Sequence, residues 1–305
     1  METKRSSIPC LSIIGTLVAI LTMLFGDNLY QQLTHRSIFE FRESSTALPS
    51  ENIVALPQIN EKIVIQRMFS VKSNNLSDNL GGDGTSTYFT WYAKEGEKLG
   101  MIEILSPGQG TSVTSYVDVA EFFNDQNVQK YIVIVRTEIP DGTHMQPAII
   151  SGAVYSQTST GWVLETEEHG ITGVGQLGSA PKGEYTRIGP DKYGITYHDI
   201  YSGMGTYSEN LVLITYINKK FSVILDVPLV RENGNGCENH NDLGPCSKYE
   251  STYEYIESSM SPNYYDFVVT EGGGYVDQNG NFIPALGKVT YYFFDGSKYI
   301  IYKGE

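Results

Sequence analysis

The feature that most constrains this chain is an uncharged apolar segment near its start. Residues 8–25 read IPCLSIIGTLVAILTMLF, eighteen positions without a charged side chain, and the basic pair Lys4-Arg5 precedes them. An α-helix of that length rises about 27 Å, close to the roughly 30 Å hydrocarbon core of a bilayer. Only small hydroxyl residues interrupt the apolar positions, so no polar stripe remains. The sequence predicts a single N-terminal hydrophobic helix, directed to a membrane, within residues 1–26.

Two fates are open to this segment, an uncleaved anchor or a signal peptide that is removed. A cleavable signal has a shorter apolar region that ends in small residues, whereas cleavage after Gly26 would place the large Leu24 three positions back. We therefore expect an anchor, with secretion after cleavage as the alternative. Cys10 opens the apolar run, so lipid attachment at its end is not expected. With Lys4 and Arg5 in the cytoplasm, the C-terminal part is predicted outside it, periplasmic or at the cell surface.

The remaining cysteines agree with an oxidising compartment. Cys237 and Cys246 are nine positions apart in a loop rich in Gly and Asn, and we predict a disulfide between them. The alternative is a metal site with His240 as a further ligand, but a second pair of ligands is missing. The loop 232–246 also carries many side-chain oxygens, as calcium sites do, yet it lacks the EF-hand spacing. Neither metal nor cofactor is predicted.

Charge excludes one class of partner. The chain has a formal net charge of −14, and it holds no run of basic residues longer than two. Proteins that bind a phosphate backbone need clustered Lys and Arg, so nucleic acid is not an expected partner. An acidic exterior favours solubility and cationic partners instead. The 22 tyrosines point to strands, where the ring covers a pleated surface and the hydroxyl stays wet.

Along the chain, residues 27–60 are predicted as a stalk or linker, because Pro49 and Pro57 prevent a continuous helix. Residues 61–305 form the predicted extracytoplasmic β-rich region. Within it, EKIVIQRMFSV at 61–71 and STYFTWYAKEG at 86–96 are expected to be strands, separated by a polar loop. Whether this region forms one sheet system or two lobes dividing near Pro181 is left open.

One soluble helix is predicted to begin near Ser112, which would serve as its N-cap. The apolar residues that follow have helical spacing: Val113, Tyr116, Val117, Ala120 and Phe123. We expect this helix to pack on a sheet. The predicted fold class is therefore mainly β, or α+β with one packed helix, with antiparallel hairpin-rich sheets after the N-terminal hydrophobic helix.

The strand predictions rest on apolar runs bounded by turn residues. YIVIVRTEI at 131–139 is one strand, and a hairpin is expected through residues 158–161. NLVLITYI and FSVILDVPL form a second hairpin through residues 218–220, and their continuous apolar runs indicate burial on both faces. YESTYEYIES and YYDFVVTEGG are strand-like. Near the C-terminus, Asp295-Gly296 between two aromatic strands predicts a two-residue hairpin turn.

Motifs that would carry chemistry are weak. Gly173-Val-Gly175-Gln-Leu-Gly178 fits the dinucleotide-binding string, but Pro181 follows where a helix must begin, so a glycine-rich loop is the interpretation and no nucleotide is expected. No G-x-S-x-G string marks a nucleophilic serine. The histidines fall in no metal-ligand pair and are interpreted as solvated loop residues: His35, His144, His169, His198 and His240.

The absence of a catalytic signature decides the functional hypothesis. The leading one is an exported or membrane-anchored, non-enzymatic envelope protein that binds a protein or glycan partner. The alternative is an extracytoplasmic hydrolase that acts on glycan through paired carboxylates, since the 35 acidic residues can meet in the fold. A purely structural membrane-associated domain is a third. Aromatic residues from Tyr291 to Tyr299 could stack on sugar rings, although ordinary sheet packing is the more common role of such alternating aromatics.

Overall fold

A computed structural model defines the fold of most of the chain after residue 54. It describes residues 55–71, 77–80, 87–93, 98–99, 102–103, 111–125, 127–203, 205–233, 247–258, 260–277, 281–284 and 287–302. The predicted membrane segment 8–25, most of the stalk, and the loop with Cys237 and Cys246 lie outside these residues. Two compact units divide the chain, Met1–Asn52 and Ile53–Glu305, and every described residue belongs to the second. Within these ranges, helices capable of spanning a bilayer are absent.

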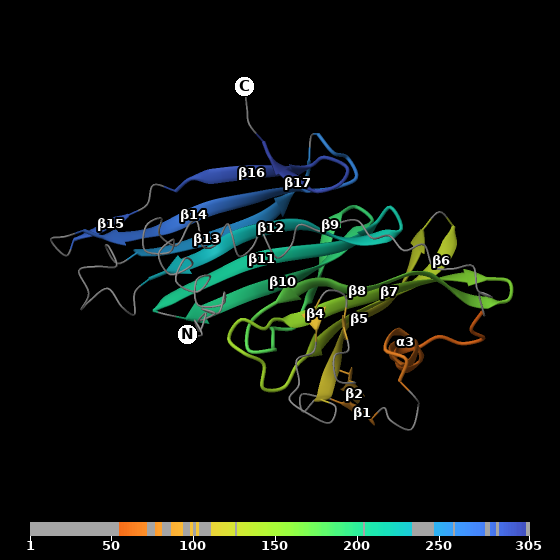
Figure 1. The fold of residues 1–305 in the computed structure, drawn as a ribbon. Coiled ribbons are helices and arrows are strands. Elements are labelled where there is room, and N and C mark those ends of the chain that lie inside the picture. Colours follow the sequence, from red (N-terminus) through yellow and green to blue (C-terminus); the bar gives the residue numbers. More distant parts are fainter. Residues whose placement is uncertain are drawn as a thin grey trace, which may run out of the picture. The chain divides into compact units, whose positions relative to one another are not determined.

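The described part is mainly β, as predicted, and most of it forms two antiparallel sheets (Figure 1). The first sheet has six strands in the order β1-β2-β5-β6-β7-β8. The predicted strand after residue 131 and the hairpin through residues 158–161 are confirmed here. The strands are β1 (Ser77–Leu80), β2 (Thr87–Ala93), β5 (Thr111–Asp125), β6 (Val128–Glu138), β7 (Ala148–Thr158) and β8 (Gly161–Val174).

The helix predicted from Ser112 is wrong, because these residues form strand β5. Val113, Ser115 and Val117 are buried on one face of the sheet, the alternation of a strand. A bulge between Val117 and Val119 then shifts the register, so that Val119 is buried on the opposite face. Burial alternates with a period of two residues, but the bulge moves the buried side chains from one face to the other. The combined spacing of the apolar residues therefore resembles that of a helix.

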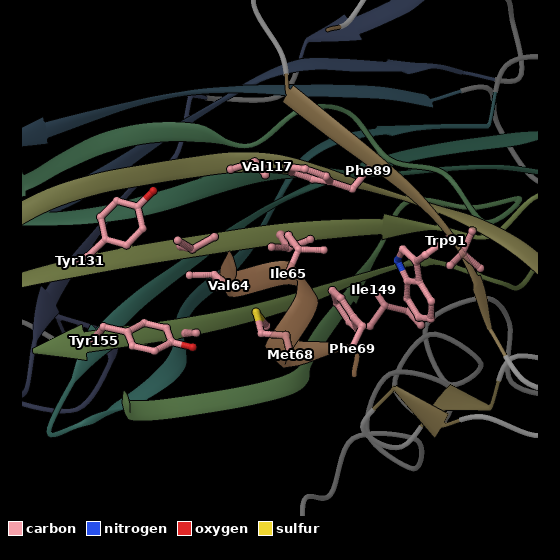
Figure 2. Close-up of a cluster of buried hydrophobic side chains, with 14 of the residues drawn as sticks. Val64, Ile65, Met68, Phe69, Phe89, Trp91, Val117, Tyr131, Ile149 and Tyr155 are labelled. Atoms are coloured by element: carbon pink, nitrogen blue, oxygen red, sulfur yellow. The ribbon is translucent and has the colours of Figure 1, made fainter. Parts of the chain in front are cut away.

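The one described helix is α3 (Glu61–Met68), in a segment predicted as a strand. Asn60 caps it, since its side-chain oxygen accepts a hydrogen bond from the backbone N–H of Ile63 at 3.0 Å. Figure 2 shows α3 against the first sheet, among aromatic side chains from its strands. The residues Val64, Ile65 and Met68 are buried there, and this packing overrides the β-branched sequence.

The second sheet has the order β17-β16-β14-β13-β12-β11-β10-β9, with β15 beside β14. The chain passes into it at residues 175–183, the stretch that contains Pro181. A separate pair joins β3 (Lys98–Leu99) to β4 (Ile102–Glu103). The strands are β9 (Glu184–Gly189), β10 (Lys192–Gly203), β11 (Thr206–Ile217), β12 (Lys220–Glu232), β13 (Ser247–Ile256), β14 (Asp266–Val276), β15 (Phe282–Pro284), β16 (Val289–Phe294) and β17 (Tyr299–Ile301).

The hairpins of the second sheet largely match expectation. Strands β11 and β12 pair across a turn in which Asn218 and Lys219 have positive φ, and Leu211–Ile214 are buried on both faces. The last hairpin differs from its prediction. Phe294 pairs with Tyr299, so four residues connect the strands, and the carboxylate of Asp295 accepts the backbone N–H groups of Ser297 and Lys298. Asp295-Gly296 therefore starts a longer loop instead of forming a two-residue turn.

A shared hydrophobic core joins the two sheets. It includes Ile134, Ile150 and Val154 from the first sheet, with Tyr197 and Phe221 from the second. The Phe221 ring lies directly over Gly152, where an added Cβ would come within 2.7 Å of the ring. Only a residue without a side chain leaves room for this ring, so Gly152 sets how closely β7 and β12 approach.

We predict that Gly152→Ala destabilises the protein by about 1–3 kcal/mol, because the new methyl group forces Phe221 from its place. Adding Phe221→Leu should recover part of that loss. Gly287→Ala is the control, since its Cβ would come no closer than 3.4 Å to any neighbour. Urea unfolding followed by tryptophan fluorescence gives the free energies, and equal stability of the Gly152→Ala and Gly287→Ala variants would contradict the packing described.

Candidate functional site: a groove between two strand edges

Strand β12 is paired along only part of one side. Its other side follows β11 from Tyr207 to Ile217, whereas β13 pairs with it only at Val230–Glu232. Strand β13 continues instead along β14 over its whole length. Residues 220–229 of β12 therefore have a strand neighbour on one side only, among the residues that the structure describes. Backbone N–H and C=O groups of alternate residues point away from that neighbour and toward the open side.

The reason for this departure lies in a bulge. Val230 pairs with Glu209 and Pro228 pairs with Asn210, so Leu229 is an extra residue in β12. A bulge bends its strand and increases the local twist. Pro228 has no N–H to donate to a ladder, which suits a place where pairing ends. Strand β12 thus separates from β13 at this bulge, and the open edge of β12 begins there.

Strand β17 provides the facing edge. It stands last in the strand order and pairs only with β16. Its residue Tyr299 fixes the strand on the core of the second sheet. The Tyr299 ring contacts Phe267 and Phe294, and its hydroxyl donates a hydrogen bond to the Tyr265 carbonyl at 2.9 Å. Burial raises the pKa of Tyr299 well above its usual range, so the hydroxyl remains a donor at all ordinary pH.

A groove of about 510 Å³ separates the two edges. It is lined by Val223–Val227 of β12 and by Lys298–Ile301 at β17, with Tyr292 beside them. Side chains of successive strand residues point to opposite faces, so a groove lined by consecutive residues runs along the strand edges. Val223 is 38% exposed and Ile301 is 51% exposed, which leaves apolar side chains at the rim. The groove therefore combines open backbone edges with apolar walls.

The charged groups in the groove are few. Asp226 already accepts a hydrogen bond from the side chain of Asn210 at 3.0 Å, and Lys298 belongs to the loop before β17. Neither group faces a nucleophile or a second carboxylate in the lining. General acid–base chemistry needs such partners within hydrogen-bond reach. The lining residues of the groove include no such pair.

The histidines lie elsewhere, and for two of them the loop interpretation is wrong. His169 is on β8, pairs with Glu167 at 3.0 Å and contacts the Phe69 ring. His198 is on β10 and pairs through Nδ1 with Glu209 at 2.6 Å, not with Asp199 beside it. His144 does lie in a loop. The other two, His35 and His240, are outside the described residues.

Two pairs of carboxylates share a cation among the described residues: Asp125 and Glu165 both contact Lys130, and Asp118 and Glu138 both contact Arg136. A further cluster surrounds His198. Glu209 accepts hydrogen bonds from both His198 and the Tyr207 hydroxyl. Burial raises the pKa of Tyr253, and the negative charges of Glu184 and Glu209 raise it further. No group of three or more possible metal ligands occurs in the described ranges. Sequence reasoning missed this cluster, because its members come from four separate strands.

The remaining predicted motifs are placed as follows. The string from Gly173 to Gly178 forms the end of β8 and a loop in which Gly175 and Gly178 have positive φ, as a glycine-rich loop requires. Tyr292, Phe294 and Tyr299 lie in the core of the second sheet, whereas Tyr291 is 47% exposed. Packing in the core of the sheet therefore explains three of the five aromatic residues that we considered for sugar stacking.

The fold and groove define a two-sheet antiparallel β protein with an incomplete edge. No protein-family model matches the chain, and neither a curated protein nor a solved structure is detectably similar to it.

We predict a distinctive pattern of amide hydrogen exchange at this edge. The N–H groups of residues 223–227 that point into the groove should exchange rapidly, while those that bond β11 exchange slowly; the register shift at Ile224 interrupts a strict alternation. Residues 211–214 of β11 pair with β10 and β12, so all their amides should be protected. Exchange measured by NMR distinguishes these cases, and uniform protection of residues 223–227 would show that the edge is covered.

Proposed function

We propose that this chain is a membrane-anchored binding protein whose β-rich part lies outside the cytoplasm and holds a partner in the groove between β12 and β17. The observation that carries the proposal is the pair of facing strand edges that no described strand covers. An open edge exposes a row of backbone donors and acceptors, which proteins normally pair or protect. A partner that supplies matching groups gains hydrogen bonds and buries the apolar rim.

The placement outside the cytoplasm is supported by the sequence. Eighteen uncharged residues at 8–25 favour lipid over water, and the basic pair before them favours the cytoplasmic side. A disulfide between Cys237 and Cys246 belongs to the same proposal. The net charge of −14 suits a protein that remains soluble outside the membrane while its N-terminus is held there.

A hydrolase that acts on glycan is the second candidate, and the cluster around His198 favours it. Glu209 is held by His198 and Tyr207, and the charges of Glu184 and Glu209 both raise the pKa of Tyr253. Two carboxylates near one site are the groups that glycoside hydrolysis needs. However, the two hydrogen bonds to Glu209 are also what a purely structural role would require, since a partly buried carboxylate needs donors. The groove is therefore the stronger basis for a function.

The location is tested on intact cells that express the full-length chain. A membrane-impermeant maleimide should label Cys237 and Cys246 only after mild reduction, because both are outside the cytoplasm and joined. The Cys237→Ser/Cys246→Ser variant is the control for background labelling. Labelling without reduction would contradict the disulfide, and labelling only after the cells are opened would contradict the location.

The binding function is tested by comparing two matched variants in envelope extracts. Ile301→Arg places a charge at the groove rim, whereas Val289→Arg places one at a residue of similar exposure on β16, outside the groove lining. We expect one stoichiometric partner to purify with the wild type and with Val289→Arg, and at least about tenfold less of it with Ile301→Arg. Glycan hydrolysis that Glu209→Gln abolishes, without any stoichiometric partner, would support the hydrolase instead.

A further inference from the structure

Resting on this proposed binding function, we infer that the groove takes one extended segment of a different, basic polypeptide, which runs antiparallel to both β12 and β17 and closes a ring of six strands. The inference concerns the shape, direction and charge of the occupant. Strand directions supply the first two, and the charge of the chain supplies the third.

The direction follows from counting reversals around the sheet. From β12 the order passes through β13, β14 and β16 to β17, and each neighbouring pair is antiparallel. Four reversals return the chain to its starting direction, so β12 and β17 run the same way. A ring of purely antiparallel neighbours needs an even number of strands, and these five lack one. A single added strand, opposite in direction to both edges, completes the alternation.

The backbone chemistry selects an extended segment. Both walls present edges whose alternate N–H and C=O groups have no ladder partner among the described strands, and another extended backbone matches that spacing on its two sides. The part of the open edge that lines the groove, Val223–Val227, is five residues long and contains a bulge at Ile224, so it spans at most about 17 Å of strand. Alternate side chains of such a segment would face Tyr292 and Tyr299, so apolar residues at every second position fit this wall.

The charge of the chain argues against a second copy and for a basic partner. Residues 247–302, which contain the strands on one side of the groove, carry seven carboxylates against three lysines. The whole chain has a net charge of −14, so two copies repel each other at long range. Pro228 lacks an N–H donor at the end of the open β12 edge, and Lys298 borders the β17 edge. Both features discourage indiscriminate edge pairing.

The experiment uses the full-length protein in mild detergent and 12-residue peptides selected on it from a random library. We expect selected peptides to alternate apolar and polar residues, to carry net positive charge, and to slow amide exchange of residues 223–227 and 299–301 on binding. Methylating one backbone nitrogen that bonds an edge should weaken binding about tenfold, because a hydrogen-bond donor is lost while the side chains stay.

Two lysine variants locate the site. Val223→Lys should weaken peptide binding about tenfold by crowding the groove, whereas Val289→Lys should change it less than about twofold. Circular dichroism spectra and melting temperatures of both variants show that they remain folded. If Val223→Lys proves unfolded, the methylated peptides and the exchange pattern decide by themselves.

Several results would overturn the inference while leaving the proposed binding function intact. Selected peptides that protect other residues would show that the binding site lies elsewhere. Peptides that bind equally well when methylated would show that binding does not add a strand. Residues 223–227 already protected in the free monomer would mean that the chain itself covers the edge. Protection that appears only as the free protein dimerises would identify a second copy as the occupant. Failure to select any binding peptide also rejects the inference.

Discussion

The burial of β11 on both faces is the constraint from which the rest of the structure follows. Val212 and Ile214 face the first sheet, and Leu211 and Leu213 face the core formed with the C-terminal strands. A strand covered on two faces must be apolar at consecutive positions, and the run LVLI meets that need. One strand therefore belongs to two hydrophobic cores. A change in its position would disturb the contact between the sheets and the support beneath the groove together.

A buried polar contact fixes how the two sheets meet. Asp118 of β5, at 1% side-chain exposure, accepts hydrogen bonds from Arg136 of β6 and from the Tyr197 hydroxyl of β10 at 2.8 Å. Burial raises the pKa of Asp118, and these two donors oppose the rise. Because an unpaired buried carboxylate is costly, a sliding of one sheet over the other is penalised. The apolar core supplies attraction, and this contact specifies one register.

The sequence predicted strands wherever an apolar run ended at a clear turn. The hairpins β7–β8 and β11–β12 were found this way. Gly161 and Asn218 lie in their turns with positive φ, a conformation that few other residue types adopt easily. The errors at β5 and α3 have one cause in common, which is that local spacing cannot reveal a tertiary contact. Ser115 can be buried because its hydroxyl forms hydrogen bonds with Trp91 and Thr137. A buried position of β5 is therefore polar, and the apolar alternation of a strand is not visible in the sequence.

The helix α3 carried signals that were available but outweighed. Asn60 is the N-cap, Glu61 begins the first turn and Arg67 lies in the last turn, an arrangement that suits the helix dipole. Ile63, Val64 and Ile65 nevertheless favour a strand by propensity. An eight-residue helix is unstable alone, so only the sheet beneath it decides the outcome. That sheet is assembled from residues far along the chain, which no local pattern includes.

The groove was beyond sequence reasoning for a related reason. Pro228 signals an irregular or edge position, but whether β13 stays beside β12 depends on the extra Leu229 and on the pairing of β13 with β14. What the sequence did contain is the means by which an open edge is tolerated. A short β17, a proline and a nearby lysine all oppose uncontrolled pairing, and the net charge of −14 makes the approach of a second copy of this acidic chain unfavourable.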